Sequence, residues 1–202
     1  MMRRVVITGV GAVTPIGNTA KEMWAGVREG KCGIDKITKY DISNRKVKVA
    51  AEVKNLPVEE LVDKHDLRKM DLFCTFAMIA ADEAIADSGL SFEGEEDKCG
   101  VIVSSGIGGI STIEKEYSKG LEKGFDRVSP YFIPSVITNM AAGRIAIKHN
   151  LQGMCSCVVT ACAGGTNAVG DSFRQIRDGY ADVMVCGGAE AGITEISVGG
   201  FT

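Results

Sequence analysis

The cysteine at position 162 is the residue best placed to do covalent chemistry. It follows the apolar run 158–160 and precedes the small residues 163–165, so we expect it at the turn between a buried strand and a helix. Open α/β sheets place their sites at the carboxyl ends of strands. The free N–H groups at a helix N-terminus stabilise a thiolate there. The pattern therefore predicts a nucleophile, the alternative being that Cys162 is one more buried cysteine among seven.

A nucleophilic thiol needs a base or an electrophilic partner, and the sequence offers few. The two histidines are His65 and His149. His149 follows the end of an expected helix, where cationic residues pair with free carbonyl groups. His65 lies in the charged stretch 63–66. We expect neither to be catalytic, so the candidate nucleophile has no evident partner.

Two glycine-rich segments were compared with phosphate-binding motifs. The segment 9–14 resembles a dinucleotide fingerprint, but Thr14 replaces its third glycine. The segment 105–109 lacks the ending of a P-loop, so it either packs its backbone against a neighbour or forms a wall of the site around Cys162. Glu190 follows an apolar strand and two glycines, and we expect a buried carboxylate bonded to turn amides rather than an acid–base group.

Composition describes an ordinary globular chain. The 202 residues are 45% hydrophobic and 24% charged, which excludes a disordered tail, a collagen-like repeat and a coiled coil. With 23 Lys and Arg against 26 Asp and Glu, the net charge of −3 argues against a nucleic-acid-binding protein. Local basic residues are either solvated or a docking site for an acidic partner: Lys64, Arg68, Lys69 and Arg127.

The cysteines predict a reduced, cytoplasmic protein without a metal site. Their number is odd, no pair has C-x-x-C spacing, and no histidine stands near Cys155 and Cys157 to complete a zinc site. No apolar run has the length of a membrane-spanning helix. The start of the chain, 1–15, is broken by glycines and lacks a small-residue cleavage site, so we do not interpret it as a signal peptide.

Strand and helix patterns alternate along the chain with glycine turns between them. This predicts an α/β fold, a mostly parallel sheet with right-handed crossovers and helices on both faces. A hairpin is expected within 31–58, with pairing around 47–53. The other expected elements are strands at 4–8, 99–104, 154–160 and 181–186, and helices at 19–30, 71–88, 110–121, 135–148 and 166–177.

Five motifs together resemble one family. They are RRVVITGVGAVTPIGN at 3–18, SSGIGG at 104–109, SPYFIPSVITNMAAG at 129–143, VVTACAGG at 158–165 and ADVMVCGGAEA at 181–191. In this order they resemble the amino-terminal half of the β-ketoacyl-acyl-carrier-protein synthases, in particular the synthase II group of fatty-acid elongation. The resemblance covers residues 1–202 and implies a thiolase-like fold in a cytoplasmic homodimer.

The resemblance also implies roles for particular residues. Cys162 would carry the acyl thioester, which a carbanion from decarboxylated malonyl-carrier attacks. Ile107 and Phe132 would stand near the acyl pocket, Phe132 reaching across the dimer. Arg68, Lys69 and Arg127 would dock the acyl carrier protein. The chain would need no metal and no cofactor of its own, because the carrier brings the phosphopantetheine.

The chain departs from the family in one respect. The family's two catalytic histidines, a supporting lysine and a glycine-phenylalanine gate belong to its other half, and neither His65 nor His149 matches them. The chain is therefore interpreted as a truncated fragment that cannot condense alone. Two alternatives remain: a non-catalytic partner like the chain-length factors, which usually lack the cysteine, and a thiolase-superfamily acyltransferase acting on acyl-coenzyme A.

Overall fold

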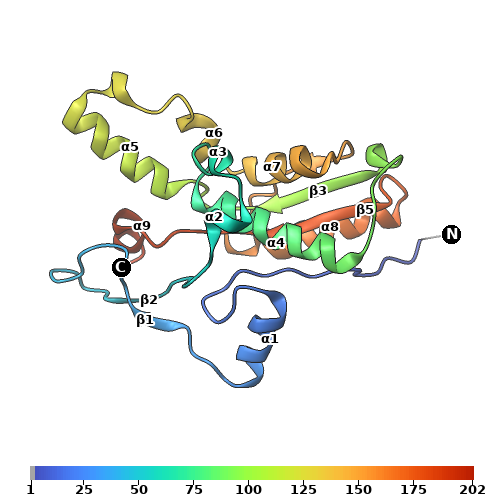
Figure 1. Cartoon of the computed structure of the whole chain (residues 1–202), viewed down its shortest axis with the longest axis horizontal. Coiled ribbons are helices and arrows are strands. Elements are labelled where there is room, and N and C mark those ends of the chain that lie inside the picture. Colours follow the sequence, from blue (N-terminus) through green and yellow to red (C-terminus); the bar gives the residue numbers. More distant parts are fainter. Residues whose placement is uncertain (1–2) are drawn as a thin grey trace.

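A three-stranded parallel sheet forms the centre of the molecule. The computed structural model describes residues 3–202. The sheet has the order β4-β3-β5, with β3 at Cys99–Ser104, β4 at Cys155–Ser156 and β5 at Val183–Gly188 (Figure 1). All six residues of β3 are buried, so both faces of the central strand are covered. A buried parallel strand of this kind needs helices on both sides.

Three helices provide most of that cover. They are α4 at Leu72–Ser88, α7 at Met140–His149 and α8 at Gly164–Arg177. Helices α4 and α7 pack on each other, α7 and α8 both contact β3, and α8 also lies against β5. The core between them includes Phe73, Cys74, Val101, Ile102 and Ile145. The predicted fold class, a parallel sheet flanked by helices, is confirmed.

The remaining elements lie around this centre. An antiparallel pair joins β1 at Ile34–Lys36 to β2 at Val49–Ala51. Helix α5 at Ile110–Lys123 extends away from the sheet (Figure 1). The others are α1 at Ala20–Arg28, α2 at Val58–Leu61, α3 at Lys64–Leu67, η1 at Glu96–Lys98, η2 at Phe125–Arg127, α6 at Phe132–Val136, η3 at Ala161–Ala163 and α9 at Glu195–Gly200.

Two of the expected helices, at 19–30 and 71–88, are present, and their ends follow local sequence signals. Thr19 caps α1 by accepting from the N–H of Glu22 at 3.1 Å. Asp71 caps α4, and Gly89 ends it in the left-handed conformation with φ 63°. The expected strand 99–104 and the helices near 110–121 and 166–177 are also present.

The prediction of a strand at 4–8 is wrong. The segment is extended but pairs with no strand in the described part of the chain, and Ile7 is 82% exposed. Its continuation is held by α4 instead, because Asp87 and Glu83 accept from the N–H groups of Val10 and Ala12, both at 2.9 Å. A strand needs a partner strand, and side-chain acceptors take up the backbone donors here.

The helix expected over 135–148 is broken in two. Helix α6 ends at Val136, and α7 begins at Met140. The carbonyl of Val136 accepts from the N–H of Gly109 at 3.0 Å, and Ile137 is extended with ψ 136°. The Val136 carbonyl thus accepts a tertiary hydrogen bond in place of a helical one. The periodicity of the sequence does not show that this exchange of partners takes place.

The other strand boundaries also shift. The strand expected at 154–160 is only β4, because the carbonyl of Val158 accepts from the hydroxyl of Ser104 instead of a ladder N–H. The strand expected at 181–186 is β5, two residues later. The hairpin expected within 31–58 is confirmed, although its second strand is the shorter Val49–Ala51. The short helices α2, α3 and α9 were not predicted.

Candidate active site

Cys162 lies in a one-turn helix directly before α8. It is exposed, and its neighbour Ala161 has φ 49°, a left-handed conformation that an alanine rarely adopts. Strain of this kind persists only where the surrounding structure imposes it, and it is typical of functional turns. The turn leads into Gly164, the first residue of α8, so the thiol stands at the N-terminal end of a 14-residue helix. The predicted position of Cys162 at the start of a helix is therefore observed, but the strand before it, β4, ends earlier, at Ser156.

Ser104, the last residue of β3, anchors this turn. Its side chain is buried, and its hydroxyl donates to the carbonyl of Val158 in the segment that leads to Cys162. A β-carbon at Gly164 would lie 1.9 Å from Ser104 Oγ, so only glycine permits this approach. The end of β3 thus contacts the chain on both sides of Cys162. Ser104 was not predicted as a site residue, although its place at the end of a buried strand could have indicated one.

The loop Ser105–Gly109 forms one wall beside the turn. A β-carbon at Gly106 would lie 3.8 Å from the carbonyl carbon of Ala161. Glu190 Oε2 accepts from the N–H groups of Gly106 at 2.8 Å and Ile107 at 3.1 Å. The expected bonding of Glu190 to turn amides is confirmed, but the residue is exposed rather than buried.

Ile107 and Phe132 come from elements that meet at this loop. Ile107 is 37% exposed, and its Cδ1 would be 3.9 Å from a β-carbon at Gly192. Phe132 is half-buried and opens α6, whose last residue Val136 bonds Gly109. The structure therefore brings the loop of Ile107 and the helix of Phe132 into contact. Their roles in an acyl pocket remain a prediction.

Asp71 organises the far end of the loop and was foreseen only as a helix cap. It is 2% exposed, and its Oδ2 accepts from Ser111 Oγ at 2.6 Å, from the N–H of Thr112 at 2.8 Å and from Thr112 Oγ1 at 2.7 Å. Helix α5 has Gly109 as its own cap residue, which has no side chain to accept a bond. One buried carboxylate therefore caps both α4 and α5.

Both histidines have partners of their own. His149 Nε2 is 2.8 Å from Asp82 Oδ1, and Lys148 Nζ is 2.6 Å from the other oxygen of the same carboxylate. His65 Nδ1 is 3.2 Å from Lys69 Nζ. These contacts tie His149 to α4 and His65 to its own short helix, which agrees with the non-catalytic roles expected for them.

The candidate docking residues lie in two segments that meet near Tyr131. Arg68 is exposed just after α3, and Arg127 is exposed at the end of η2. Lys69 is half-buried with Nζ 5.4 Å from the centre of the Tyr131 ring. Within residues 3–202, none of these three cations has a carboxylate within salt-bridge distance. Their charge is therefore available to an acidic partner.

Two of the other cysteines, Cys74 and Cys99, are buried, unlike Cys162. Burial raises the pKa of Cys74 to about 12 and raises the pKa of Cys99. Cys32 is exposed, like Cys162. Among residues 3–202 no group of three or more His, Cys, Asp or Glu side chains is arranged to hold a metal ion. Nor is any helix of those residues both long and apolar enough to cross a membrane.

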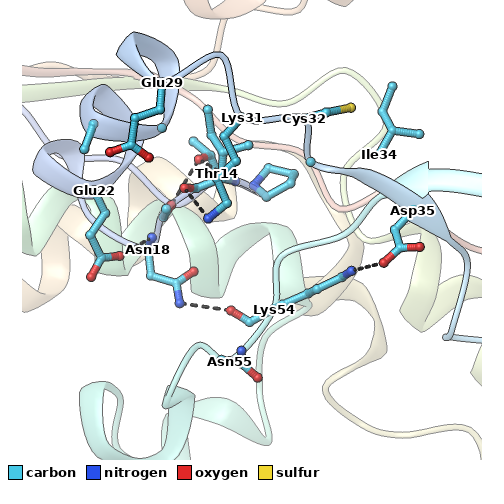
Figure 2. A pocket seen from close by; sticks show the side chains of 16 residues that line it. Thr14, Asn18, Glu22, Glu29, Lys31, Cys32, Ile34, Asp35, Lys54 and Asn55 are labelled. Carbon is cyan, nitrogen blue, oxygen red and sulfur yellow. Dashed lines mark hydrogen bonds and ion pairs between the residues drawn. The ribbon is translucent and has the colours of Figure 1, made fainter.

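A hollow of about 490 Å³ lies elsewhere, lined by α1, by β1 and by the segments 14–18 and 54–55 (Figure 2). Its polar groups mostly satisfy one another: Lys54 Nζ is 2.7 Å from Asp35 Oδ2, and Asn18 Nδ2 donates to the carbonyl of Lys54 at 3.0 Å. The neighbouring Gly9 and Gly11 do not form a phosphate cradle. Their missing β-carbons would lie 2.0 Å and 1.9 Å from carbonyl oxygens of α4, so they are glycines because the backbones touch.

Sequence comparisons agree with this geometry. The family model of the beta-ketoacyl synthase N-terminal domain matches residues 2–202. The chain is 45% identical over 200 residues to 3-oxoacyl-[acyl-carrier-protein] synthase 2 of Synechocystis sp., covering 98% of this chain and 48% of that protein. It is 44% identical over 201 residues to the Staphylococcus aureus protein of the same name, covering 99% of this chain and 49% of that protein. The chain spans about half the length of the curated relatives it matches.

Solved structures agree as well. The ishigamide ketosynthase/chain length factor superposes with a TM-score of 0.87 at 27% identity, over 98% of this chain and 50% of that one. A beta-ketoacyl synthase from Burkholderia phymatum superposes with a TM-score of 0.83 at 26% identity, over 99% of this chain and 50% of that one. The fold is therefore the thiolase-like ketosynthase fold. More particularly, the chain belongs to the β-ketoacyl synthase family and spans its N-terminal domain.

Proposed function

We propose that this chain carries the nucleophile of a 3-oxoacyl-[acyl-carrier-protein] synthase that elongates fatty acids, with Cys162 as the acyl-bearing residue. The observation that carries the proposal is the exposed Cys162 at the start of α8, on a turn held by Ser104 and beside the Gly106 loop. The relatives at 44–45% identity bear the name of this activity.

The first step is transfer of an acyl group to the thiol. The Cys162 sulfur attacks the carbonyl carbon of the acyl thioester on the carrier's phosphopantetheine. A new carbon–sulfur bond forms, the bond to the phosphopantetheine sulfur breaks, and the departing thiolate takes up the proton released from Cys162. The first N–H groups of α8 favour negative charge on the attacking sulfur.

The second step forms the carbon–carbon bond. Malonyl-carrier loses carbon dioxide, and the resulting carbanion attacks the acyl carbonyl and displaces the Cys162 sulfur. Charge develops on the malonyl thioester oxygen and requires preorganised donors. His65 and His149 are engaged by Lys69 and Asp82. We infer that the donors come from the part of the family's fold beyond the half that this chain spans.

The partner of the reaction is proposed to be an acyl carrier protein. Acidic carriers would meet the charges of Arg68, Lys69 and Arg127, of which Lys69 lies over the Tyr131 ring, next to the start of α6. Ile107 and Phe132 are proposed to line the acyl pocket, Phe132 from across a homodimer. The chain is proposed to act in the cytoplasm and to need no cofactor except the carrier's phosphopantetheine.

One alternative has a specific observation behind it. A solved relative at 27% identity is described as a ketosynthase/chain length factor, so a non-catalytic partner subunit shares this fold. The cysteine at position 162 favours the catalytic role, because a partner subunit has no need of a nucleophile. A third possibility, transfer from acyl-coenzyme A, differs in the donor and can be tested in the same experiment.

The experiment is acylation of the chain by acyl-carrier protein, followed by intact mass and peptide mapping. We expect one hydroxylamine-sensitive acyl group on Cys162, formed faster from the carrier than from acyl-coenzyme A. The Cys162→Ala variant should lose it, and Cys32→Ala should keep it, because Cys32 is equally exposed but lies outside the turn. An adduct that persists in Cys162→Ala, or none in the unaltered chain, would contradict the proposal.

A further inference from the structure

Glu190 follows the end of β5, and its carboxylate accepts hydrogen bonds from the loop beside Cys162. Its Oε2 accepts from the N–H groups of Gly106 and Ile107 at 2.8 and 3.1 Å. Its Oε1 accepts from Ser105 Oγ at 3.2 Å. Ser105 Oγ in turn accepts from the N–H of Gly108 at 3.0 Å. The carboxylate therefore gathers the polar groups of four successive loop residues.

The loop that Glu190 holds lies beside the turn of Cys162. A β-carbon at Gly106 would lie 3.1 Å from Glu190 Oε2 and 3.8 Å from the carbonyl carbon of Ala161. Gly106 thus lies near both the carboxylate and the residue that precedes the thiol. A loop released from Glu190 would move at this contact, and the backbone that places the Ile107 side chain would move with it.

The bonding pattern indicates positioning rather than folding. Glu190 is exposed, so the core does not depend on it. The other end of the loop has separate support, because Gly109 donates to Val136 and Asp71 caps α5. Bonds from backbone N–H groups to a charged carboxylate are stronger than neutral ones. Glu190 therefore acts on the half of the loop that faces Cys162.

We propose that Glu190 is a positioning residue for the thiol site, holding Ile107 and Gly106 where the acyl chain passes Cys162. This inference rests on the proposed function. It assigns Glu190 no contact with the thioester and no proton transfer. Contacts with the Ile107 wall help only acyl chains that reach it, so Glu190 should matter for long chains and not for acetyl.

The test compares Glu190→Ala, Glu190→Gln and the unaltered chain in acylation of Cys162 by long-chain and acetyl carriers. Misplacement of a binding wall can cost large factors in rate, and we expect Glu190→Ala to lower the long-to-short ratio about tenfold. Glu190→Gln keeps an oxygen for the two N–H groups and should restore most of the ratio. Glu22→Ala is the matched control, because Glu22 is an exposed carboxylate that accepts from the N–H of Asn18 at 2.8 Å in α1.

Two further readouts separate the possible failures. Hydrogen exchange of the Gly106 and Ile107 amides, which donate to Glu190, should speed up about tenfold in Glu190→Ala, while iodoacetamide should alkylate Cys162 at an unchanged rate. An unaltered chain that is alkylated but accepts no acyl group would overturn the proposed function. A second outcome would overturn only the role of Glu190. In it the unaltered chain is acylated, but Glu190→Ala leaves unchanged either the ratio of long-chain to acetyl acylation or the hydrogen exchange of the loop. Loss of acylation together with rapid alkylation of the buried Cys74 in that variant would also overturn it, because it would indicate general unfolding.

Discussion

Cys162 is placed by its neighbours, and its own side chain contributes little to its position. Ala161 takes the left-handed conformation, Gly164 permits close approach, and Ser104 binds the preceding segment. Each of these residues acts through its backbone or through one short side chain. The thiol is left exposed for chemistry while the turn that carries it is held rigidly.

The first prediction concerns the reactivity of individual thiols. At pH 8, iodoacetamide should alkylate Cys162 and Cys32 at least about 100-fold faster than Cys74, because a thiol with a pKa of about 12 is only about 10⁻⁴ ionised at that pH and is also buried. Peptide mapping of a time course measures the rates. Unfolding in urea provides the control, since all seven cysteines should then react alike. Comparable rates for Cys74 and Cys162 in the folded chain would refute the expectation.

The second prediction concerns two adjacent glycines. A Gly164→Ala side chain would collide with Ser104 Oγ at 1.9 Å, so we expect a loss of about 1–3 kcal/mol in unfolding free energy and slower acylation of Cys162. Gly165→Ala is the matched control. Its new β-carbon would have its nearest neighbour, the nitrogen of Gly188, at 3.5 Å, and the change should stay within about 1 kcal/mol. Urea unfolding measures both, and equal effects would count against the contact.

At the scale of elements, buried carboxylates connect segments that are far apart in the chain. Asp71 joins the start of α4 to the start of α5. Glu52 does the same for the segments around the β1-β2 pair. It is 3% exposed, and it accepts from the N–H of Thr38 at 3.1 Å and from the hydroxyl of Thr38 at 2.7 Å. Such bonds hold loops that have little apolar surface of their own.

The third prediction is a pH dependence from Glu52. Burial by itself would raise the pKa of this carboxyl, but the hydrogen bonds from Thr38, together with the backbone N–H and the charge of Lys39, outweigh burial and the pKa is lowered. A lowered folded-state pKa contributes stability that is present above the unfolded pKa, about 4.3, and is lost as the pH falls through the folded value. Glu52→Gln should therefore destabilise the chain at pH 7 and lose that effect in acid.

Urea unfolding at pH 7 and at successively lower pH measures this difference. Glu59→Gln is the control, because Glu59 is 75% exposed and bonds only Lys64 across 3.4 Å. It should change stability little at any pH. A destabilisation by Glu52→Gln that stays constant down to strongly acidic pH would contradict the assignment.

At the scale of the whole molecule, much apolar surface faces solvent. Ile7 and Phe201 are each 82% exposed, and Ile147 is 75% exposed. Exposed apolar area of this extent marks surfaces that associate with other protein. The thiol site is also open on one side, with Cys162 exposed and both histidines bound elsewhere. The two observations agree with a chain that spans half the length of its relatives.

The fourth prediction follows from that open site. Supplied with acyl-carrier and malonyl-carrier, this chain alone should form the Cys162 thioester slowly and make no β-ketoacyl product at enzyme-like rates. The loss of even one donor to developing oxyanion charge typically costs about 10²–10³ in rate. Mass spectrometry of the protein and chromatography of the products measure the two steps separately. Rapid product formation, abolished by His65→Ala or His149→Ala, would show that one of these histidines is catalytic after all.

The local features of this protein could be predicted from the amino-acid sequence alone. Thr19 and Asp71 indicate helix starts, and Gly89 indicates a helix end. The apolar run 99–104 indicates a buried strand. These features are readable because capping and burial depend on neighbours in the chain. The place of Cys162 between strand and helix was predicted for the same reason. The resemblance of five motifs added the family, which the comparisons confirmed.

Contacts between distant segments come from the tertiary structure. It bonds Glu190 to Gly106 and Ser104 to Val158, pairs that lie 84 and 54 positions apart. It also left 4–8 without a partner strand and broke the helix expected over 135–148, where Val136 bonds Gly109. Periodicity reports which face of a segment is apolar. The partner that a backbone group finds depends on the packing of distant segments, and that packing holds the wall beside Cys162.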